Sequence, residues 1–210
     1  MEPLGIEVER AIEALRAGSP VILPTDTVYG LCANADSEEA VRRAYQLKGR
    51  EPLQPSALLA PDVDALFDRI PELRSLAPML RALLPGPLTL VVPNPARRYG
   101  WLAGSTPGAI GIRVPDLPGP ATIVLARVGA VVATSANLPG GPDPRRVADI
   151  PREIIEGCEA VLDAGDLPGT PSTVIDLAGE EPRLLREGAV PAAEVLGRLR
   201  SATGGASGRD

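Results

Sequence analysis

Short apolar runs, separated by turns rich in proline and glycine, limit this chain to a fold with brief buried strands. The runs at 21–23, 109–114 and 130–133 are too short for helices of ordinary length. Segments with apolar residues at helical spacing lie between the runs, as at 6–17. Because helices and short strands alternate, the pattern predicts an α/β domain with a mixed parallel and antiparallel sheet and flanking helices.

Local signals delimit the individual elements. Ser37 is expected to cap the N-terminus of a helix and Gly49 its C-terminus. No internal repeat or change of composition marks a second domain, so residues 1–200 are predicted to form one domain. From Ser201 the chain lacks apolar residues that could pack, which predicts a disordered tail over 201–210. Strands are predicted at 21–23, 56–60, 88–92, 109–114, 130–133, 160–163, 172–177 and 183–187, and helices at 6–17, 62–69, 71–83, 120–128, 147–156 and 191–198, besides the one between Ser37 and Gly49.

Charge and composition exclude several classes of function. The net charge of -6 argues against strong general affinity for nucleic acid, although a local basic groove remains compatible with it. The chain has no histidine, which excludes the usual Ser-His-Asp and Cys-His catalysis and any site with histidine metal ligands. Cys32 and Cys158 match no metal or redox spacing and are expected to be free thiols. No signal peptide and no apolar run of membrane-spanning length is visible, so we expect a soluble, cytoplasmic protein without a membrane partner.

Lys48 is the only lysine of the chain, and the other 20 of the 21 basic residues are arginines. It lies two residues before Arg50, where the predicted helix ends. An ammonium and a guanidinium side by side can hold a polyanion, such as a nucleotide phosphate, in two different ways. The alternative is that one lysine survived a compositional bias at a helix C-terminus, where cations are mildly favoured.

Polar residues follow two of the predicted strands. A hydroxyl-rich turn at 24–31 follows the strand at 21–23, and Thr-Ser-Ala-Asn at 134–137 follows the strand at 130–133. In an open α/β sheet, ligand-binding loops lie at such strand ends. The alternative is that both segments are turns stabilised by their own side chains. Arg113, near the end of a buried strand, needs either a protein carboxylate or a ligand anion as its partner.

The polar segment 94–106 is irregular and contains Trp101, the only tryptophan. It is compatible with a mobile flap or with an exposed loop that Trp101 anchors.

Seven of these stretches, in the same order, resemble the YrdC/Sua5 family of threonylcarbamoyl-adenylate synthases. The resemblance extends over about residues 6–190. It implies a twisted mixed sheet with flanking helices around a concave cavity. The stretches are Pro-Thr-Asp-Thr-Val-Tyr-Gly-Leu at 24–31, Lys-Gly-Arg at 48–50, Pro-Gly-Pro-Leu-Thr-Leu at 85–90, Gly-Ile-Arg-Val-Pro at 111–115, Thr-Ser-Ala-Asn at 134–137, Ser-Thr-Val-Ile-Asp at 172–176, and Leu-Leu-Arg-Glu-Gly at 184–188.

The resemblance also implies an activity. Such proteins condense L-threonine, bicarbonate and ATP, with Mg²⁺ bridging phosphates, into L-threonylcarbamoyl-adenylate, and they release pyrophosphate. Partner proteins then transfer the threonylcarbamoyl group to an adenosine of tRNA, at position 37. Direct contact with tRNA is a weaker expectation, because the chain is acidic.

Site residues carry over position by position from the resemblance. Lys48 and Arg50 match the family's KxR pair and are expected near the phosphates as catalytic residues. No side chain is identified as a metal ligand. The residues expected to contact ATP are Lys48, Arg50, Gln54, Asn137 and Arg186, and those expected to contact threonine are Thr27, Arg113, Ser135 and Ser172.

The chain departs from the family pattern in two places, and two other functions remain open. The sequence at 51–56 differs from the usual one, which affects the match at Gln54, and Leu58-Leu59 stands where some members carry a histidine. In length the chain resembles the single-domain form. The alternatives are a non-catalytic RNA-binding module of the same fold and a related carbamoyl-adenylate chemistry, as in the similar domain of hydrogenase-maturation proteins.

Overall fold

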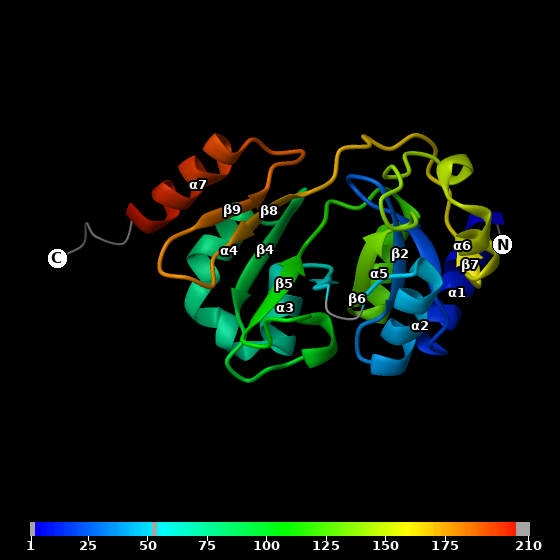
Figure 1. Ribbon diagram of the computed structural model, residues 1–210, viewed down its shortest axis with the longest axis horizontal. Coiled ribbons are helices and arrows are strands. Elements are labelled where there is room, and N and C mark those ends of the chain that lie inside the picture. The colour runs from blue at the N-terminus through cyan, green and yellow to red at the C-terminus, as the bar shows by residue number, and fades with distance from the viewer. Residues whose placement is uncertain (1–2, 52–53, 205–210) are drawn as a thin grey trace.

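The computed structural model describes residues 3–51 and 54–204, and it places nine strands of these residues in one sheet. The strand order is β7-β1-β2-β6-β3-β5-β4-β8-β9. The pairs β1–β7, β3–β5 and β4–β8 are parallel and the others are antiparallel, so the predicted mixed sheet is confirmed (Figure 1). The strands are β1 (Val21–Pro24), β2 (Tyr29–Asn34), β3 (Ala57–Leu59), β4 (Leu88–Pro93), β5 (Ala109–Arg113), β6 (Val131–Ser135), β7 (Ala160–Val161), β8 (Thr173–Asp176) and β9 (Arg183–Arg186).

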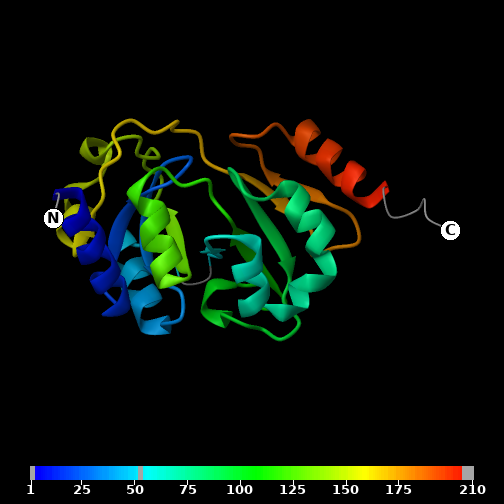
Figure 2. The same ribbon diagram turned by 180° about the vertical axis from the view of Figure 1, so that it is seen from behind.

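Helices cover the sheet unequally. Helices α1 and α5 lie side by side over the β1–β2–β6 end of the sheet (Figure 2). Helices α2, α3, α4 and α7 pack on the opposite face, as parts of the larger apolar core. No helix in the described part of the chain is long and apolar enough to cross a membrane. The helices are α1 (Pro3–Arg16), α2 (Glu38–Lys48), α3 (Val63–Arg69), α4 (Ala77–Leu83), α5 (Pro120–Val128), α6 (Arg152–Glu156) and α7 (Ala192–Gly204), with 3₁₀ turns η1 (Pro71–Leu76), η2 (Gly100–Leu102) and η3 (Val147–Asp149).

Strand β4 shows how the sheet acquires two different faces. Successive side chains of a strand point to opposite faces. Leu88, Leu90 and Val92 are fully buried in the larger core, whereas Thr89 and Val91 lie on the other face, along a cavity. The same alternation recurs in β8, where Val174 and Asp176 line the cavity. The face that lacks a helical cover over β5, β4 and β8 therefore becomes the floor of the cavity.

Strand β2 was not predicted, because its first residues were assigned to the turn at 24–31. Its residues are buried on both faces, so the period-2 pattern that identifies a half-buried strand is missing. The turn is shorter than expected, and Gly30 and Leu31 pair with Ser135 and Thr134 of β6. The hydroxyl-rich turn is thus held directly beside the polar end of β6.

The C-terminal helix is longer than predicted. It continues to Gly204, four residues into the segment 201–210 that was expected to be a disordered tail. Val195 and Leu199 bury their side chains, and the Ser201 hydroxyl donates to the Gly197 carbonyl at 3.2 Å, so the helix is held through its last turns. Residues 205–210 lie outside the described residues. The predicted helices at 71–83 and 147–156 are each divided into a 3₁₀ turn followed by a shorter α-helix.

Helix α2 begins and ends where its capping residues predict. The Ser37 hydroxyl accepts a hydrogen bond from the Ala40 amide at 3.2 Å. Gly49 has left-handed backbone angles (φ 65°), and its amide donates to the Gln46 carbonyl at 3.0 Å. The Arg50 amide donates to the Tyr45 carbonyl at 2.9 Å. This C-cap fixes the directions in which Lys48 and Arg50 leave the helix.

Gly49→Ala is expected to lower the free energy of unfolding by about 1 kcal/mol, because the left-handed conformation disfavours a Cβ atom. The nearest atoms to that Cβ would be those of Pro139 at 3.9 Å, so no collision adds to the effect. Urea unfolding would measure it. Gly108→Ala is the control, since its backbone is not left-handed and the added Cβ meets nothing within 4 Å. Equal changes in the two variants would contradict the capping role of Gly49.

Candidate functional site

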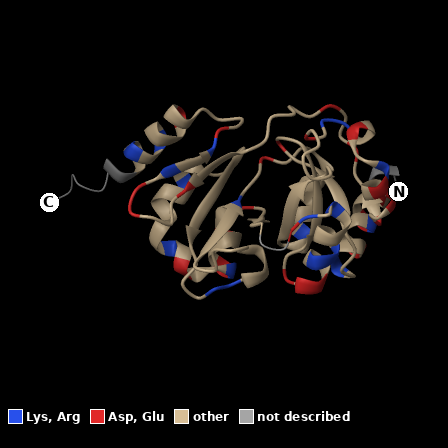
Figure 3. Cartoon of the chain, viewed as in Figure 1, with Lys and Arg blue, Asp and Glu red and all other residues tan. Residues whose placement is uncertain are grey.

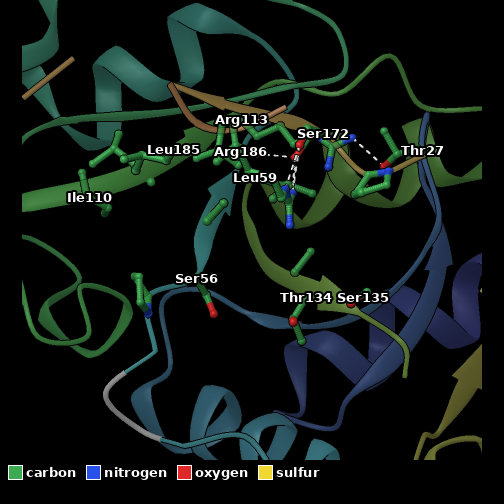
Figure 4. A pocket seen from close by; sticks show the side chains of 18 of the residues that line it. Thr27, Ser56, Leu59, Ile110, Arg113, Thr134, Ser135, Ser172, Leu185 and Arg186 are labelled. Carbon is green, nitrogen blue, oxygen red and sulfur yellow. Dashed lines mark hydrogen bonds between the residues drawn. The ribbon is translucent and has the colours of Figure 1, made fainter. Parts of the chain in front are cut away.

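A cavity of about 480 Å³ opens over the sheet, on the face whose β5, β4 and β8 strands carry no helix (Figure 4). Charged residues are concentrated on helices and loops, and the strands are mostly uncharged (Figure 3). Hydroxyl groups dominate its polar lining. The polar residues that line it are Thr25, Thr27, Ser56, Thr89, Thr106, Thr134, Ser135 and Ser172, with Arg50, Arg113, Arg183 and Arg186 and the carboxylates of Asp143 and Asp176.

Arg113, at the end of β5, is held by a protein carboxylate. Its Nη2 donates to Asp26 and, at 2.9 Å, to the Thr27 hydroxyl. The Arg113 and Asp26 side chains are only 10% and 9% exposed. Burial lowers the pKa of Arg113, and the Asp26 charge opposes that effect. Asp26 is itself fixed by the Asp116 amide, which donates to its Oδ2 at 3.1 Å.

Hydroxyl groups extend the site from Arg113 toward the edge of the sheet. The Thr25 and Thr27 hydroxyls are 2.9 Å apart, and the Thr89 and Ser172 hydroxyls are 2.8 Å apart. Arg186, on β9, donates from Nη2 to the Ser172 carbonyl at 2.9 Å and to its hydroxyl at 3.2 Å (Figure 4). Hydroxyls that both donate and accept can bind the amine, hydroxyl or carboxylate of a small amino acid.

The Lys48 ammonium lies behind the end of β6. Its Nζ donates to the Ser135 carbonyl at 2.6 Å, to the Asn137 carbonyl at 2.8 Å and to Asn137 Oδ1 at 2.6 Å. Lys48 is 5% exposed, and burial together with the Arg50 charge lowers its pKa to about 8, against the opposing charge of Asp143. The Ser135 hydroxyl also donates to Asn137 Oδ1, at 2.7 Å.

Arg50 lines the cavity and contacts Thr134, the residue before Ser135 on β6. Its Nη1 donates to the Thr134 hydroxyl at 3.0 Å and its Nη2 to the Pro55 carbonyl at 2.6 Å. Its guanidinium also lies 5.7 Å from the centre of the Tyr45 ring. Burial lowers the pKa of Arg50.

Two arginines that line the cavity have no carboxylate partner among the described residues. Within 3–51 and 54–204, neither Arg50 nor Arg186 forms an ion pair, whereas Arg113 does. An uncompensated positive charge in a partly buried position favours an anionic ligand. The arrangement can therefore bind a polyanion beside a site suited to a small amino acid.

The structure brings together most of the residues expected at the site, but not all. Thr27, Arg50, Arg113, Ser135, Ser172 and Arg186 line one cavity. Lys48 and Asn137 are absent from the described lining and lie beneath Ser135. Gln54 is exposed and also lies outside the described lining. Sequence reasoning missed Thr25, Ser56 and Thr89 as lining residues, and Asp26 as the partner of Arg113. Thr89, a polar residue between two leucines of a predicted strand, could have been found from that order.

The segment 94–106 is anchored in the structure. The Trp101 Nε1 donates to the Ala35 carbonyl at 3.3 Å, and the rings of Tyr99 and Trp101 contact edge to face, 5.8 Å between centres. Arg69 donates to the Tyr99 hydroxyl at 2.9 Å. Ala103 and Thr106 of this segment line the cavity. Of the two arrangements compatible with the sequence, the structure shows the loop that Trp101 anchors.

These features define an α/β protein with a polar cavity suited to an amino acid and a polyanion, and comparison with known proteins identifies its family. The family model for Sua5, YciO and YrdC proteins, described as "Telomere recombination", matches residues 13–188. The chain belongs to this family. The resemblance drawn from the sequence motifs is thereby confirmed.

Relatives of known name support this assignment. The chain is 34% identical to the threonylcarbamoyl-AMP synthase of Chromohalobacter salexigens, over 86% of this chain and 98% of that protein. It is 34% identical to the threonylcarbamoyl-AMP synthase of Pyrococcus abyssi, over 89% of this chain and 56% of that protein.

Solved structures show the same fold. The chain resembles P. abyssi Sua5 complexed with L-threonine (TM-score 0.78, 31% identity), covering 91% of this chain and 57% of that one. It resembles Escherichia coli YciO with a TM-score of 0.70 and 25% identity, covering 88% of this chain and 90% of that one. The chain therefore spans little more than half of the P. abyssi protein.

Asp26→Asn is expected to lower the free energy of unfolding by about 3 kcal/mol, because it leaves the buried Arg113 guanidinium without its counter-charge. Thermal or urea unfolding would measure this. Asp68→Asn is the matched control, since Asp68 forms an exposed ion pair with Arg74 and such pairs contribute little. An Asp26 variant as stable as the control would show that the pair does not hold Arg113.

Proposed function

We propose that this chain is an L-threonylcarbamoyladenylate synthase, which condenses L-threonine, bicarbonate and ATP and releases pyrophosphate. The observation that carries the proposal is a cavity that brings together Arg113, several hydroxyls, and two arginines that form no ion pair within the described residues. Relatives named threonylcarbamoyl-AMP synthase support it.

Threonine would bind around Arg113. A guanidinium has five N–H donors, and the contacts with Asp26 and Thr27 use Nη2 alone. Of the remaining donors, Nε is buried, and the N–H groups of Nη1 can donate to the threonine carboxylate. Thr27, Ser172 and Ser135 carry hydroxyls along the same cavity that can bind the threonine amine and hydroxyl.

The triphosphate would bind where the cations lack carboxylates. Arg50 and Arg186 line the cavity, and both can donate to phosphate oxygens. The family pattern also implies that Asn137 contacts the nucleotide. Its side chain lies next to that of Ser135. Gln54 is exposed and lies outside the described lining of the cavity, so its role toward the nucleotide rests on the family pattern alone.

The reaction needs no histidine. The threonine amine and bicarbonate give a carbamate and water, a carbamate oxygen attacks the α-phosphorus of ATP, and pyrophosphate leaves with the electrons of the broken P–O bond. Positioning and neutralisation of phosphate charge supply most of the catalysis in such transfers. Arg50 and Arg186 would stabilise the charge that grows on the leaving pyrophosphate.

Mg²⁺ is compatible with the cavity. Mg²⁺ is usually held by substrate phosphates and one or two carboxylates, and it neutralises phosphate charge during transfer. Asp143 lines the cavity and forms no ion pair among the described residues, whereas Asp176 is paired with Arg183 at 3.1 Å. The described residues contain no cluster of three or more acidic or cysteine side chains that would hold a metal alone. The Asp143 carboxylate would therefore be the protein's candidate ligand for Mg²⁺.

The product would pass to other proteins. A carbamate joined to a phosphate is a reactive mixed anhydride, so we propose that tRNA-modification proteins receive it in the cytoplasm and transfer the threonylcarbamoyl group to adenosine 37. Direct binding of tRNA by this chain is a weaker proposal, since its net charge is -6.

Purified protein is expected to release pyrophosphate only when ATP, threonine and bicarbonate are all present. Arg50→Met and Arg186→Met should each lower kcat/KM about 10²- to 10³-fold, the effect of losing one donor to developing oxyanion charge. Pyrophosphate release by a coupled assay would measure this. Arg74→Met, which removes an exposed cation paired with Asp68, is the control and should keep full activity.

Two results would contradict the proposal. Release of pyrophosphate without threonine would indicate a different reaction. Salt-dependent RNA binding with no release at all would instead favour a non-catalytic RNA-binding module.

A further inference from the structure

The contacts of Lys48 differ from those expected of a phosphate ligand. Its ammonium points to the end of β6, where three oxygens lie within 2.8 Å: the Ser135 carbonyl, the Asn137 carbonyl and Asn137 Oδ1. The Ser135 hydroxyl lies at 3.4 Å, as a weaker fourth contact. All four oxygens belong to the turn at 135–137.

An ammonium has three N–H donors, and these three oxygens occupy them. A phosphate oxygen could be bound only by giving up one of the contacts. Lys48 is 5% exposed and is absent from the described lining of the cavity, whereas Arg50, two residues later, lines it. Lys48, just before the C-cap Gly49, therefore points into the protein, whereas Arg50, just after it, points to the cavity.

The turn that Lys48 contacts is built around Asn137. The amide Nδ2 of Asn137 donates to the Gly141 carbonyl at 2.6 Å, and Asn137 Oδ1 accepts from Ser135 at 2.7 Å as well as from Lys48. Two main-chain carbonyls in this turn point toward Lys48. Without the cation, these carbonyls and the amide oxygen would face one another in a buried place, at a considerable electrostatic cost.

We propose that Lys48 is a positioning residue, which holds the turn at 135–137 in its binding geometry and does not itself bind the phosphates. The inference rests on the proposed function, because that function assigns threonine to Ser135 and the nucleotide to Asn137. It also explains why arginine does not stand here, although arginine supplies every other basic side chain. A planar guanidinium cannot direct three donors into a compact group of oxygens as an ammonium does.

Threonine binding in the absence of nucleotide separates the two roles, because threonine carries no phosphate. Isothermal titration calorimetry should show that Lys48→Met weakens threonine binding roughly tenfold, the effect of losing a hydrogen bond to a charged group. Ser135→Ala should weaken it similarly, and the double variant should bind as Ser135→Ala does, because Lys48 acts through Ser135. Arg43→Met is the control, since it removes an exposed cation from the same helix, paired with Glu39.

Unchanged threonine binding in Lys48→Met, with weaker ATP binding, would overturn the inference, as would losses that add up in the double variant. Pyrophosphate release by the wild-type protein is measured in parallel. If it does not depend on threonine, the proposed function fails. If it does, and Lys48→Met binds threonine normally, only the role of Lys48 is refuted.

A measurement on the wild-type protein covers the case in which Lys48→Met does not fold. The pKa of Lys48 is lowered to about 8, so the ammonium is present below that pH and is lost as the pH rises through it. Adenosine, which has no phosphate, should therefore bind several-fold more weakly at pH 9 than at pH 7. Constant adenosine affinity over this range, with falling ATP affinity, would assign Lys48 to the phosphates instead.

Discussion

The two unlike faces of the sheet are the constraint on which the site depends. Side chains alternate along β4, β5 and β8, and only one face of these strands packs against helices. Burial of Leu88, Leu90 and Val92 on that face leaves Thr89 and Val91 over the cavity. Because both faces belong to the same short strands, the residues that stabilise the core also place the lining. The site is therefore rigid wherever it belongs to the sheet.

The cations of the site differ in what compensates their charge. Arg113 is neutralised by Asp26, which fixes its side chain and leaves other donors for a ligand carboxylate. Arg50 and Arg186 are held by neutral oxygens instead, and among the described residues they form no ion pair. Neutral acceptors orient a guanidinium without cancelling its charge, so these two arginines remain attractive to phosphate. We therefore propose that Arg113 binds the carboxylate of a small amino acid and that Arg50 and Arg186 bind phosphate oxygens.

Local patterns predicted much of the fold, and the ordered motifs predicted the family. The caps of α2 were readable because Ser37 and Gly49 act on atoms within a few residues. Strand β2 was not, since burial on both faces removes the period-2 signal. The Arg113–Asp26 pair joins residues 87 positions apart, and only the sheet brings them together. The contacts of Lys48 with Ser135 and Asn137 likewise join residues 87 and 89 positions apart, which only the tertiary fold brings together.

A crystal structure of the protein with L-threonine and a non-hydrolysable ATP analogue tests the central claim most directly. We expect the threonine carboxylate on Arg113, the hydroxyls of Thr27 and Ser172 beside the amino acid, and the phosphates near Arg50 and Arg186. Lys48 should keep its contacts with Ser135 and Asn137. Phosphates bound at Arg113, or both ligands bound outside the cavity, would contradict the assignment of threonine to Arg113 and of the phosphates to Arg50 and Arg186.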